Sequence, residues 1–409
     1  MRTLTNAAER DLSTEWHALS PTRACTNTRR IRILYIIDQL CTVGGAERAL
    51  IRLIGALPED KFSPELLTFR WDSTIELFKR SPCPLHVLPL RRTYDWTALK
   101  AARQLRELLH NRRIDIVHTF HESSDLWGGM IAKLSGVPIL ISSRRDMGYL
   151  RSVKHEIAYR VFGNCFDKVL AVSERVRERC ISAERLTPSR VTTVYNGICL
   201  AEIDSVCTNR TYRSGLGVPM EAQLVAAVGN IRRIKGFDVL IRAAQLVCME
   251  YPKAAFLLVG ESSDRQCQAE LRDMVNNLDL SPNVRFLGSR TDIVPILKAS
   301  DVFCLPSRSE GFSNSLIEAM ACRLPCVATD VGGNGEAIMD GINGYLVPPE
   351  SPQALAGAIL QFLKEPDRAQ SMGREARGTV ENRFTFEGMI ERLVAMYEEL
   401  AQSAAKRIN

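Results

Sequence analysis

The sequence lacks the features that define several large classes of protein. Its 12 cysteines include no C-x2-C pair, and the two closest are Cys322 and Cys326. Others, such as Cys248 and Cys304, lie in apolar runs, where cysteine behaves as a small hydrophobic residue. This usage argues against a disulfide framework and favours a reducing, cytoplasmic location.

Long apolar runs are also missing. None approaches the ~18 residues that a membrane-spanning helix needs. Residues 1–30 have no apolar core of the kind found in a signal peptide, and we expect them to form a disordered extension. The sequence therefore predicts neither a membrane span nor a secretory signal.

No basic stretch is interleaved with aromatic residues, so the chain lacks the mark of an RNA-binding module. Its net charge of +6 is unevenly divided. Residues 1–200 hold 31 Lys and Arg against 21 Asp and Glu, a balance of +10, whereas residues 201–409 hold 22 against 26, a balance of −4. We expect the first half to face an anionic partner, and phosphorylated lipid or a membrane surface fits better than nucleic acid.

One segment of the first half combines basic and apolar residues. Arg91-Arg92 and Arg112-Arg113 bracket a helix expected at 99–109. The apolar side chains in and just before it are Trp96, Leu99, Leu105, Leu108 and Leu109. A basic amphipathic helix can dock on anionic lipid, but leucines at this spacing are more often a core-facing stripe, and both interpretations stay open.

Histidine is absent from the second half of the chain. All six histidines precede residue 156, so that half offers no imidazole for a metal site or a Ser-His dyad. His118 and His121 lie at the end of an expected strand, and their spacing could suggest a metal. No third group of ligands is evident, so we expect a polar cleft lining or a packed histidine and no metal.

Short apolar strands alternate with helical patterns, and this arrangement occurs twice. Strands are expected at 31–37, 64–69, 85–88, 114–119, 138–142, 168–172 and 190–194, and again at 223–228, 255–259, 284–287, 302–305, 326–329 and 344–347. The alternation predicts an α/β fold with doubly wound parallel sheets. Because 409 residues exceed one ordinary core, we expect two Rossmann-like domains, 31–205 and 206–385, facing a central cleft.

The most informative stretch runs from Glu310 to Glu318. It crosses a loop with Gly311 into a helix expected to begin near Ser313. The first N–H groups of such a helix favour an anion such as a diphosphate. The two glutamates would flank it and accept hydrogen bonds from sugar and ribose hydroxyls, although a loop charge and a solvated helix residue are the alternative.

Two further loops contain glycine. Residues 229–236, GNIRRIKG, follow an expected strand, and Arg232 and Lys235 could stabilise a departing diphosphate, with Arg233 as a substitute for Arg232. A basic surface turn is the alternative.

Gly44-Gly45 opens a helix expected from Ala46, so the backbone can approach a ligand there. Neither loop has the G-x-G-x-x-G spacing of a dinucleotide site, which counts against an oxidoreductase.

These motifs, in this order over about residues 31–400, resemble the retaining glycosyltransferases of family 4, which have the GT-B fold. The resemblance implies that Glu310, Arg232 and Lys235 are catalytic. The implied donor-binding residues are Gly44, Gly45, Arg232, Lys235, Leu287, Glu310, Gly311, Phe312, Ser313, Asn314, Ser315, Leu316 and Glu318. The implied acceptor-side residues are His118, His121 and Arg144. It also implies that a C-terminal helix, within 386–409, crosses back to the first domain.

Two positions depart from the family's pattern. Asn230 stands where many members have arginine, so we assign that role to Arg232 and Lys235. Arg144 stands where many members have histidine after a strand. Arginine can bind a phosphate or hydroxyl but cannot shuttle a proton at neutral pH, so this departure affects the acceptor side and not the donor site.

The resemblance implies retaining transfer of a hexosyl or N-acetylhexosaminyl group from a nucleotide-diphosphate sugar, with a UDP-sugar favoured. The expected acceptor is a glycan or a polyprenyl-linked oligosaccharide, in bacterial polysaccharide or lipopolysaccharide synthesis. No cofactor or metal is expected. The enzyme would be cytoplasmic or peripheral on the inner face of the membrane. A non-catalytic nucleotide-sugar-binding protein and a GT-B epimerase or phosphorylase are the alternatives.

Overall fold

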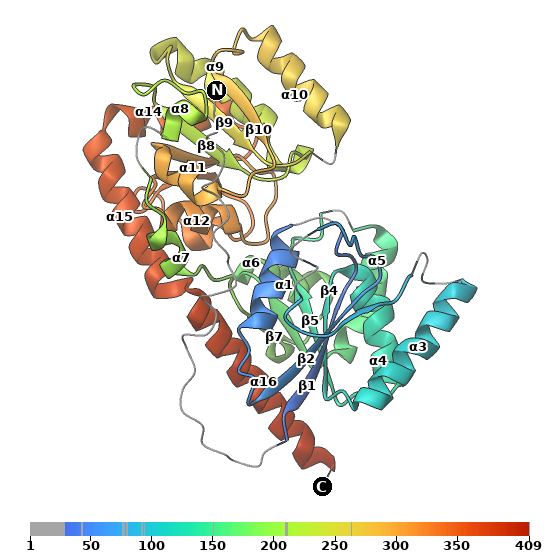
Figure 1. Ribbon diagram of the computed structural model, residues 1–409. Coiled ribbons are helices and arrows are strands. Elements are labelled where there is room, and N and C mark those ends of the chain that lie inside the picture. Colours follow the sequence, from blue (N-terminus) through green and yellow to red (C-terminus); the bar gives the residue numbers. More distant parts are fainter. Residues whose placement is uncertain are drawn as a thin grey trace, which may run out of the picture.

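The computed structural model describes residues 29–41, 44–75, 78, 81–90, 93, 95–149, 151–208, 212–262 and 264–408. The extension expected at 1–30 lies almost wholly outside the described residues, as do Arg91 and Arg92. Two α/β domains share the rest of the chain (Figure 1).

Seven parallel strands form the first sheet, in the order β3-β2-β1-β4-β5-β6-β7. They are β1 (Ile31–Ile37), β2 (Phe62–Thr68), β3 (Leu85–Val87), β4 (Ile116–Phe120), β5 (Ile139–Arg144), β6 (Lys168–Ala171) and β7 (Val191–Thr193). The strand order reverses between β1 and β4, and in such sheets ligands bind beyond the carboxyl ends of the strands at that point. Helices cover both faces, which explains why β4 and β5 are buried along their whole length.

The helical segments of this domain are α1 (Gly45–Gly55), α3 (Trp96–Arg112), η1 (Ser124–Gly129), α4 (Met130–Leu134), α5 (Val153–Phe162), η2 (Gly163–Cys165), α6 (Glu174–Ala183), η3 (Pro188–Arg190) and α7 (Leu200–Ser205). One face of the sheet packs on α3, α4 and α6, in a core that includes Leu105, Ala132 and Val176. The other face packs on α1 through Leu50 and Leu53.

Six parallel strands form the second sheet, in the order β10-β9-β8-β11-β12-β13. They are β8 (Leu224–Val228), β9 (Ala255–Val259), β10 (Val284–Gly288), β11 (Val302–Leu305), β12 (Cys326–Thr329) and β13 (Tyr345–Val347). Its helical segments are α8 (Tyr212–Gly215), η4 (Arg233–Lys235), α9 (Phe237–Glu250), α10 (Arg265–Asn277), α11 (Ile293–Ala299), α12 (Asn314–Ala321), α13 (Asn334–Ala337), α14 (Pro352–Lys364) and α15 (Pro366–Arg383). The expectation of two doubly wound parallel sheets is confirmed.

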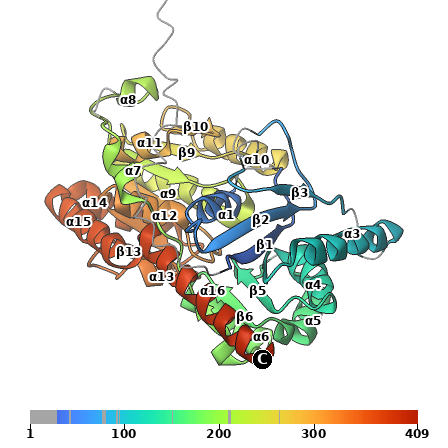
Figure 2. The same ribbon diagram turned by 60° about the horizontal axis from the view of Figure 1, so that its bottom comes forward.

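The last helix, α16 (Phe386–Ile408), leaves the second domain and lies along the first (Figures 1 and 2). Met389, Leu393 and Tyr397 of this helix are buried in the same core as Tyr35 and Phe62. The hydroxyl of Tyr397 also contacts that of Tyr35 at 3.2 Å. The C-terminal residues therefore complete the first domain, although they follow the second in the sequence.

The two domains also contact each other directly. The carboxylate of Glu336, in α13, accepts hydrogen bonds from the backbone N–H groups of Glu174 (2.8 Å) and Arg175 (2.9 Å) at the start of α6. It accepts a third from the hydroxyl of Tyr195 (2.8 Å). A carboxylate at a helix N-terminus is stabilised by the helix dipole, so Glu336 holds the second domain against the first.

Candidate functional site

Lys235 and Glu310 lie at the centre of the candidate site. The ammonium of Lys235 is 2.6 Å from Glu310 Oε1, and the hydroxyl of Ser307 donates to the same oxygen over 2.6 Å. Lys235 ends η4, just after β8, and Glu310 lies in the loop after β11. Because β8 and β11 are neighbours in the sheet, their carboxyl ends bring these two residues together. The pair therefore occupies the edge of the sheet at which nucleotides bind in doubly wound folds.

Two helix N-termini approach this place, one from each domain. Ser313 caps α12 by accepting a hydrogen bond from the N–H of Leu316 (3.4 Å). Helix α1 begins at Gly45, where a Cβ would lie 3.2 Å from the side-chain amide of Asn314, the first residue of α12. The first N–H groups of a helix have no intrahelical carbonyl partner, so the two N-termini favour an anion close to them.

Glu318 lies one turn into α12 and is half-buried. Burial raises its pKa to about 7, and the positive charges of Arg48 and Arg52 on α1 act in the opposite direction. Within the described part of the chain its carboxylate accepts no hydrogen bond. Its oxygens are therefore available to the hydroxyl groups of a ligand.

The turn that carries Lys235 is packed closely against the end of β11. Gly236 has φ +65°, and a Cβ there would lie 2.0 Å from the carbonyl oxygen of Pro306, so only glycine fits. Arg232 is exposed at the start of this turn. Arg233 is exposed as well and pairs with Glu270 of α10 at 2.7 Å. Arg233 is therefore directed toward α10, and Arg232 and Lys235 remain the predicted pair for a diphosphate.

Arg145 is a further cation that the first domain brings close to the second, and the sequence did not identify it. It follows the end of β5 and lines a small hollow with His118, Ser143 and side chains of α1 and α16. Burial lowers its pKa to about 10, against the opposing effect of Glu47. Its guanidinium donates to Asn196 Oδ1 (2.9 Å). A Cβ on Gly311 would lie 2.2 Å from the carbonyl oxygen of Arg145, so the two domains touch here.

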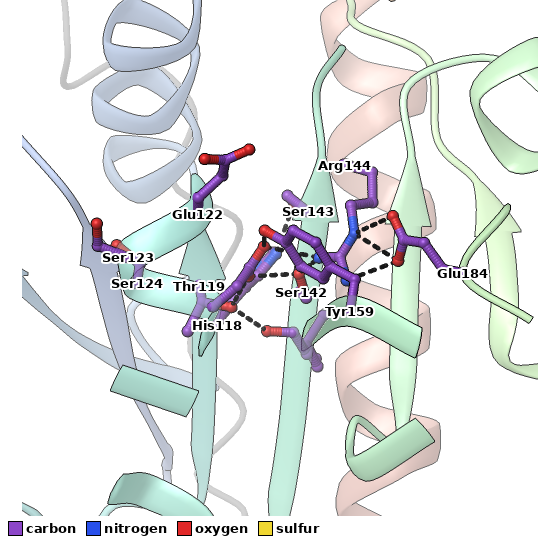
Figure 3. Close-up of polar contacts among 12 residues, drawn as sticks. His118, Thr119, Glu122, Ser123, Ser124, Ser142, Ser143, Arg144, Tyr159 and Glu184 are labelled. Atoms are coloured by element: carbon purple, nitrogen blue, oxygen red, sulfur yellow. Dashed lines mark hydrogen bonds and ion pairs between the residues drawn. The ribbon is translucent and has the colours of Figure 1, made fainter. Parts of the chain in front are cut away.

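Arg144, by contrast, lies in the interior of the first domain. It is only 1% exposed and pairs with Asp125 (2.7 Å) and Glu184 (3.1 Å). Its guanidinium also lies 4.3 Å from the centre of the Tyr159 ring. Figure 3 shows its side chain directed toward Glu184. Because Arg144 is buried among these partners, the expectation that it lies on the acceptor side of the site is corrected.

The two predicted acceptor-side histidines have different surroundings. His118 is buried, with one ring nitrogen 2.8 Å from the hydroxyl of Tyr397 and the other 2.8 Å from that of Ser143. Burial lowers its pKa to about 3, so it is neutral in the physiological range. His118 is thus a packed histidine that also lines the hollow beside Arg145. His121 is half-buried just after β4, with φ +74°.

The other predicted donor-site residues contribute in different ways. Phe312 packs its ring on those of Tyr195 and Phe384, with centroids 5.1 and 5.0 Å apart, which leaves only its backbone for a ligand. Leu316 is buried, and Leu287 is half-buried near the end of the edge strand β10. Within the described ranges, no three His, Cys, Asp or Glu residues are grouped as metal ligands would be.

The fold and the site define a two-domain α/β protein with a parallel sheet in each domain, in which two helix N-termini, one from each domain, lie close together. Residues 43–202 match the family model "Glycosyltransferase Family 4", and residues 208–379 match "Glycosyl transferases group 1". The chain belongs to the family 4 glycosyltransferases and is a glycosyltransferase with the GT-B fold.

Relatives and solved structures agree with this assignment. The chain is 29% identical over 321 residues to a D-inositol 3-phosphate glycosyltransferase of Kineococcus radiotolerans, covering 72% of this chain and 73% of that protein. It is 22% identical over 383 residues to an Escherichia coli UDP-Gal:alpha-D-GlcNAc-diphosphoundecaprenol alpha-1,3-galactosyltransferase, covering 91% and 97%. The structure of Anabaena Alr3699/HepE in complex with UDP superposes with a TM-score of 0.80 at 22% identity, covering 90% and 100%. At that identity the superposition shows the fold.

Proposed function

We propose that this enzyme transfers a hexosyl or N-acetylhexosaminyl group from a UDP-sugar to a phosphate-bearing, lipid-linked or glycan acceptor, with retention of anomeric configuration. The observation that carries the proposal is the Lys235–Glu310 pair, 2.6 Å apart, beside the N-terminus of α12. An ammonium and unpaired N–H groups suit a diphosphate, and carboxylates suit sugar hydroxyls.

Each residue at the site has a role in this mechanism. Lys235 and Arg232 neutralise the charge that develops on the departing diphosphate. Glu310 contacts hydroxyls of the transferred sugar, and Glu318 those of the ribose. The bond from the anomeric carbon to the diphosphate oxygen breaks, and the acceptor oxygen bonds to that carbon on the same face. The attack is direct because, among the described residues of these motifs, no side chain is placed as a covalent nucleophile. The acceptor proton passes to the departing phosphate. The two cations already serve the diphosphate, so no metal is assigned a role.

The acceptor side of the proposal rests on charge. Both relatives described above act on acceptors whose names include a phosphate or a diphosphate. In this chain Arg145 is half-buried and forms no ion pair with the other described residues, although the charge of Glu47 acts on it. An anionic ligand would offset the cost of the partial burial of this charge. We assign Arg145 to the phosphate of the acceptor, and polysaccharide or lipopolysaccharide assembly is the process that such acceptors serve.

Contact with an anionic membrane would bring the enzyme to a lipid-linked acceptor. Helix α5 presents Val153, Ile157 and Val161, spaced by four residues, at exposures of 73%, 53% and 62%. Lys154 and Arg160 of the same helix are also exposed. Apolar and basic residues on one exposed helix suit an anionic lipid surface, so we assign the docking to α5. No helix of the described residues is long and apolar enough to span a bilayer.

Helix α3, the other candidate for docking, is mainly a packing element. Leu105 and Leu109 lie in the core, as the packed-helix alternative expects, whereas Trp96 and Leu99 are exposed. The cysteines of the described part are unpaired, which is usual in a reducing compartment, and we propose the cytoplasmic face of the membrane as the location.

The test is turnover of UDP-glucose, UDP-galactose and their N-acetylhexosamine counterparts with a membrane lipid extract, measured as UDP released and labelled lipid formed. Transfer to lipid supports the proposal. Saturable UDP-sugar binding without product supports the non-catalytic alternative. Interconversion of sugars without an acceptor supports an epimerase, and dependence on inorganic phosphate supports a phosphorylase.

A further inference from the structure

Two segments must be held in register for Lys235 to face Glu310. One is η4 with the turn around it, and the other is the loop between β11 and α12. The separation of the two residues along the chain is 75 positions, and their side chains meet at 2.6 Å. Neither segment is a regular strand or a long helix, so contacts beyond the pairing of β8 with β11 and the packing of Gly236 on Pro306 help to fix their relative position.

Arg308, two residues before Glu310, joins these segments. Its backbone N–H donates to the carbonyl oxygen of Ile234 in η4 over 2.8 Å. Its Nη1 donates to the carbonyl oxygen of Arg233, also in η4. One residue of the Glu310 loop therefore holds the Lys235 turn through both its main chain and its side chain.

The same guanidinium reaches two carboxylates. Nη1 and Nη2 donate to the two oxygens of Asp238, in the first turn of α9, over 2.8 and 2.7 Å. Nη2 donates to Glu350, which follows β13, over 3.0 Å, and Nε donates to the other oxygen of the same carboxylate. The paired carboxylates raise the pKa of Arg308, and Arg308 helps to lower that of Asp238.

All five donors of Arg308 are thereby occupied by protein acceptors: one carbonyl oxygen and four carboxylate oxygens. A guanidinium with no remaining donor does not bind substrate. Its planar fork matches three acceptor groups at once, whereas a lysine ammonium at this position would not.

We propose that Arg308 is a positioning residue for the donor diphosphate: it fixes the η4 turn against the Glu310 loop and so sets the place of Lys235. The inference rests on the proposed function, because it assigns Lys235 to the diphosphate. It predicts that loss of Arg308 weakens recognition of the diphosphate specifically and leaves recognition of the nucleoside unchanged.

The experiment compares binding of UDP and of uridine by isothermal titration in four proteins: wild type, K235A, R308K and the K235A/R308K double variant. The ratio of the two affinities isolates the contribution of the diphosphate. Removal of one charge-assisted hydrogen bond to a ligand typically lowers the affinity by roughly tenfold or more. We expect the ratio to fall by about tenfold in K235A, by a similar factor in R308K, and no further in the double variant, because both changes remove one interaction.

Arg213 provides the matched control. It is a buried arginine of the same domain that donates to the carbonyl oxygens of Ala299 and Ala222 and to the carboxylate of Asp301. These acceptors lie beside the amino ends of β8 and β11, whereas the candidate site lies at their carboxyl ends. R213K should lower thermal stability as R308K does, with the UDP-to-uridine ratio unchanged. E350Q weakens only one of the two carboxylate contacts of Arg308, so it should lower the UDP-to-uridine ratio by a smaller factor than R308K. It replaces R308K in the test if that variant does not fold.

The inference would be overturned if R308K left the ratio of UDP affinity to uridine affinity unchanged. If R308K does not fold, an unchanged ratio in E350Q would have the same meaning. It would also be overturned if the two single substitutions lowered the ratio independently, so that their factors multiplied in the double variant. A similar fall of the ratio in R213K would also overturn it, because the effect would then be general loosening of the domain. Absence of UDP binding by the wild type would overturn the proposed UDP donor itself, and this inference with it.

Discussion

Arg144 and Arg145 are adjacent in the chain but lie on opposite sides of the first sheet. Arg144 pairs with Asp125 and Glu184 and contacts rings on the α5 side. Arg145 lines a hollow with residues of α1 and α16, next to the second domain. The chain therefore uses one arginine to hold the interior of a domain and the next to present a positive charge to the site.

Substitutions at these two positions should separate stability from activity. R144M leaves Asp125 and Glu184 buried without their shared partner, and loss of one member of such a group costs about 3–5 kcal/mol of the free energy of unfolding. R145M should cost less stability and should raise the KM for the acceptor. Urea denaturation and steady-state kinetics measure the two effects. A larger stability loss in R145M than in R144M would contradict the assignment.

Removal of either predicted diphosphate cation should slow the reaction. We expect R232A and K235A each to lower kcat by about 10²-fold or more, as loss of a charge-stabilising group typically does. R233A is the matched control, because Arg233 is on the same turn but pairs with Glu270. Kinetics with the native donor and thermal melting of all three variants measure the effect. Near-normal rates in both R232A and K235A would refute the diphosphate assignment.

Substitution of Glu310 and of Glu318 should affect different kinetic quantities. E310Q weakens the contact with Lys235 and, by the proposed role, with the reacting sugar, so kcat should fall. E318Q should mainly weaken nucleotide binding, because the ribose does not react. The comparison requires kcat from saturating donor and the affinity for UDP in each variant. Equal losses of affinity with no change in rate would be inconsistent with both roles.

Glu318 should also give donor binding a pH dependence. Its pKa is raised from the ordinary 4.5 to about 7, so its carboxyl group takes up a proton as the pH falls through 7. A protonated carboxyl accepts hydrogen bonds more weakly, so the affinity for UDP should decrease below pH 7, and this step should be absent in E318Q. His118 does not account for such a step, because its pKa is about 3.

The stability of the ligand-free protein should change in the opposite sense. A carboxyl group with a raised pKa in the folded state contributes stability below about pH 4.5, and this contribution is lost as the pH rises through 7. E318Q should remove that contribution to the pH profile of unfolding. A profile that is the same in wild type and E318Q would show that Glu318 does not titrate in this range.

The sequence predicts the sheets well, because each strand is a local apolar run bounded by turn residues, as at Val302–Leu305. It also assigns Lys235 and Glu310 to one donor site, and the structure brings the two side chains together because the strands before them end at one edge of a sheet. It fails at Arg144 because the direction of a strand side chain reverses with each residue, so an error of one position exchanges the two faces. Arg308 could not be identified from the sequence, since its acceptors come from η4, α9 and the segment after β13, which only the folded chain brings together.

The last prediction concerns the membrane. Substitution of Val153, Ile157 and Val161 by serine removes the exposed apolar stripe of α5, and we expect the variant to lose cosedimentation with vesicles that contain phosphatidylglycerol. L134S/M249S is the matched control, because Leu134 and Met249 are equally exposed, at 73% and 77%, but lie on α4 and α9. Binding of the wild type should weaken between 50 and about 300 mM salt, because Lys154 and Arg160 contribute through screened charge. Binding that survives both the serine substitutions and high salt would exclude α5 as the docking helix and leave the donor site unaffected.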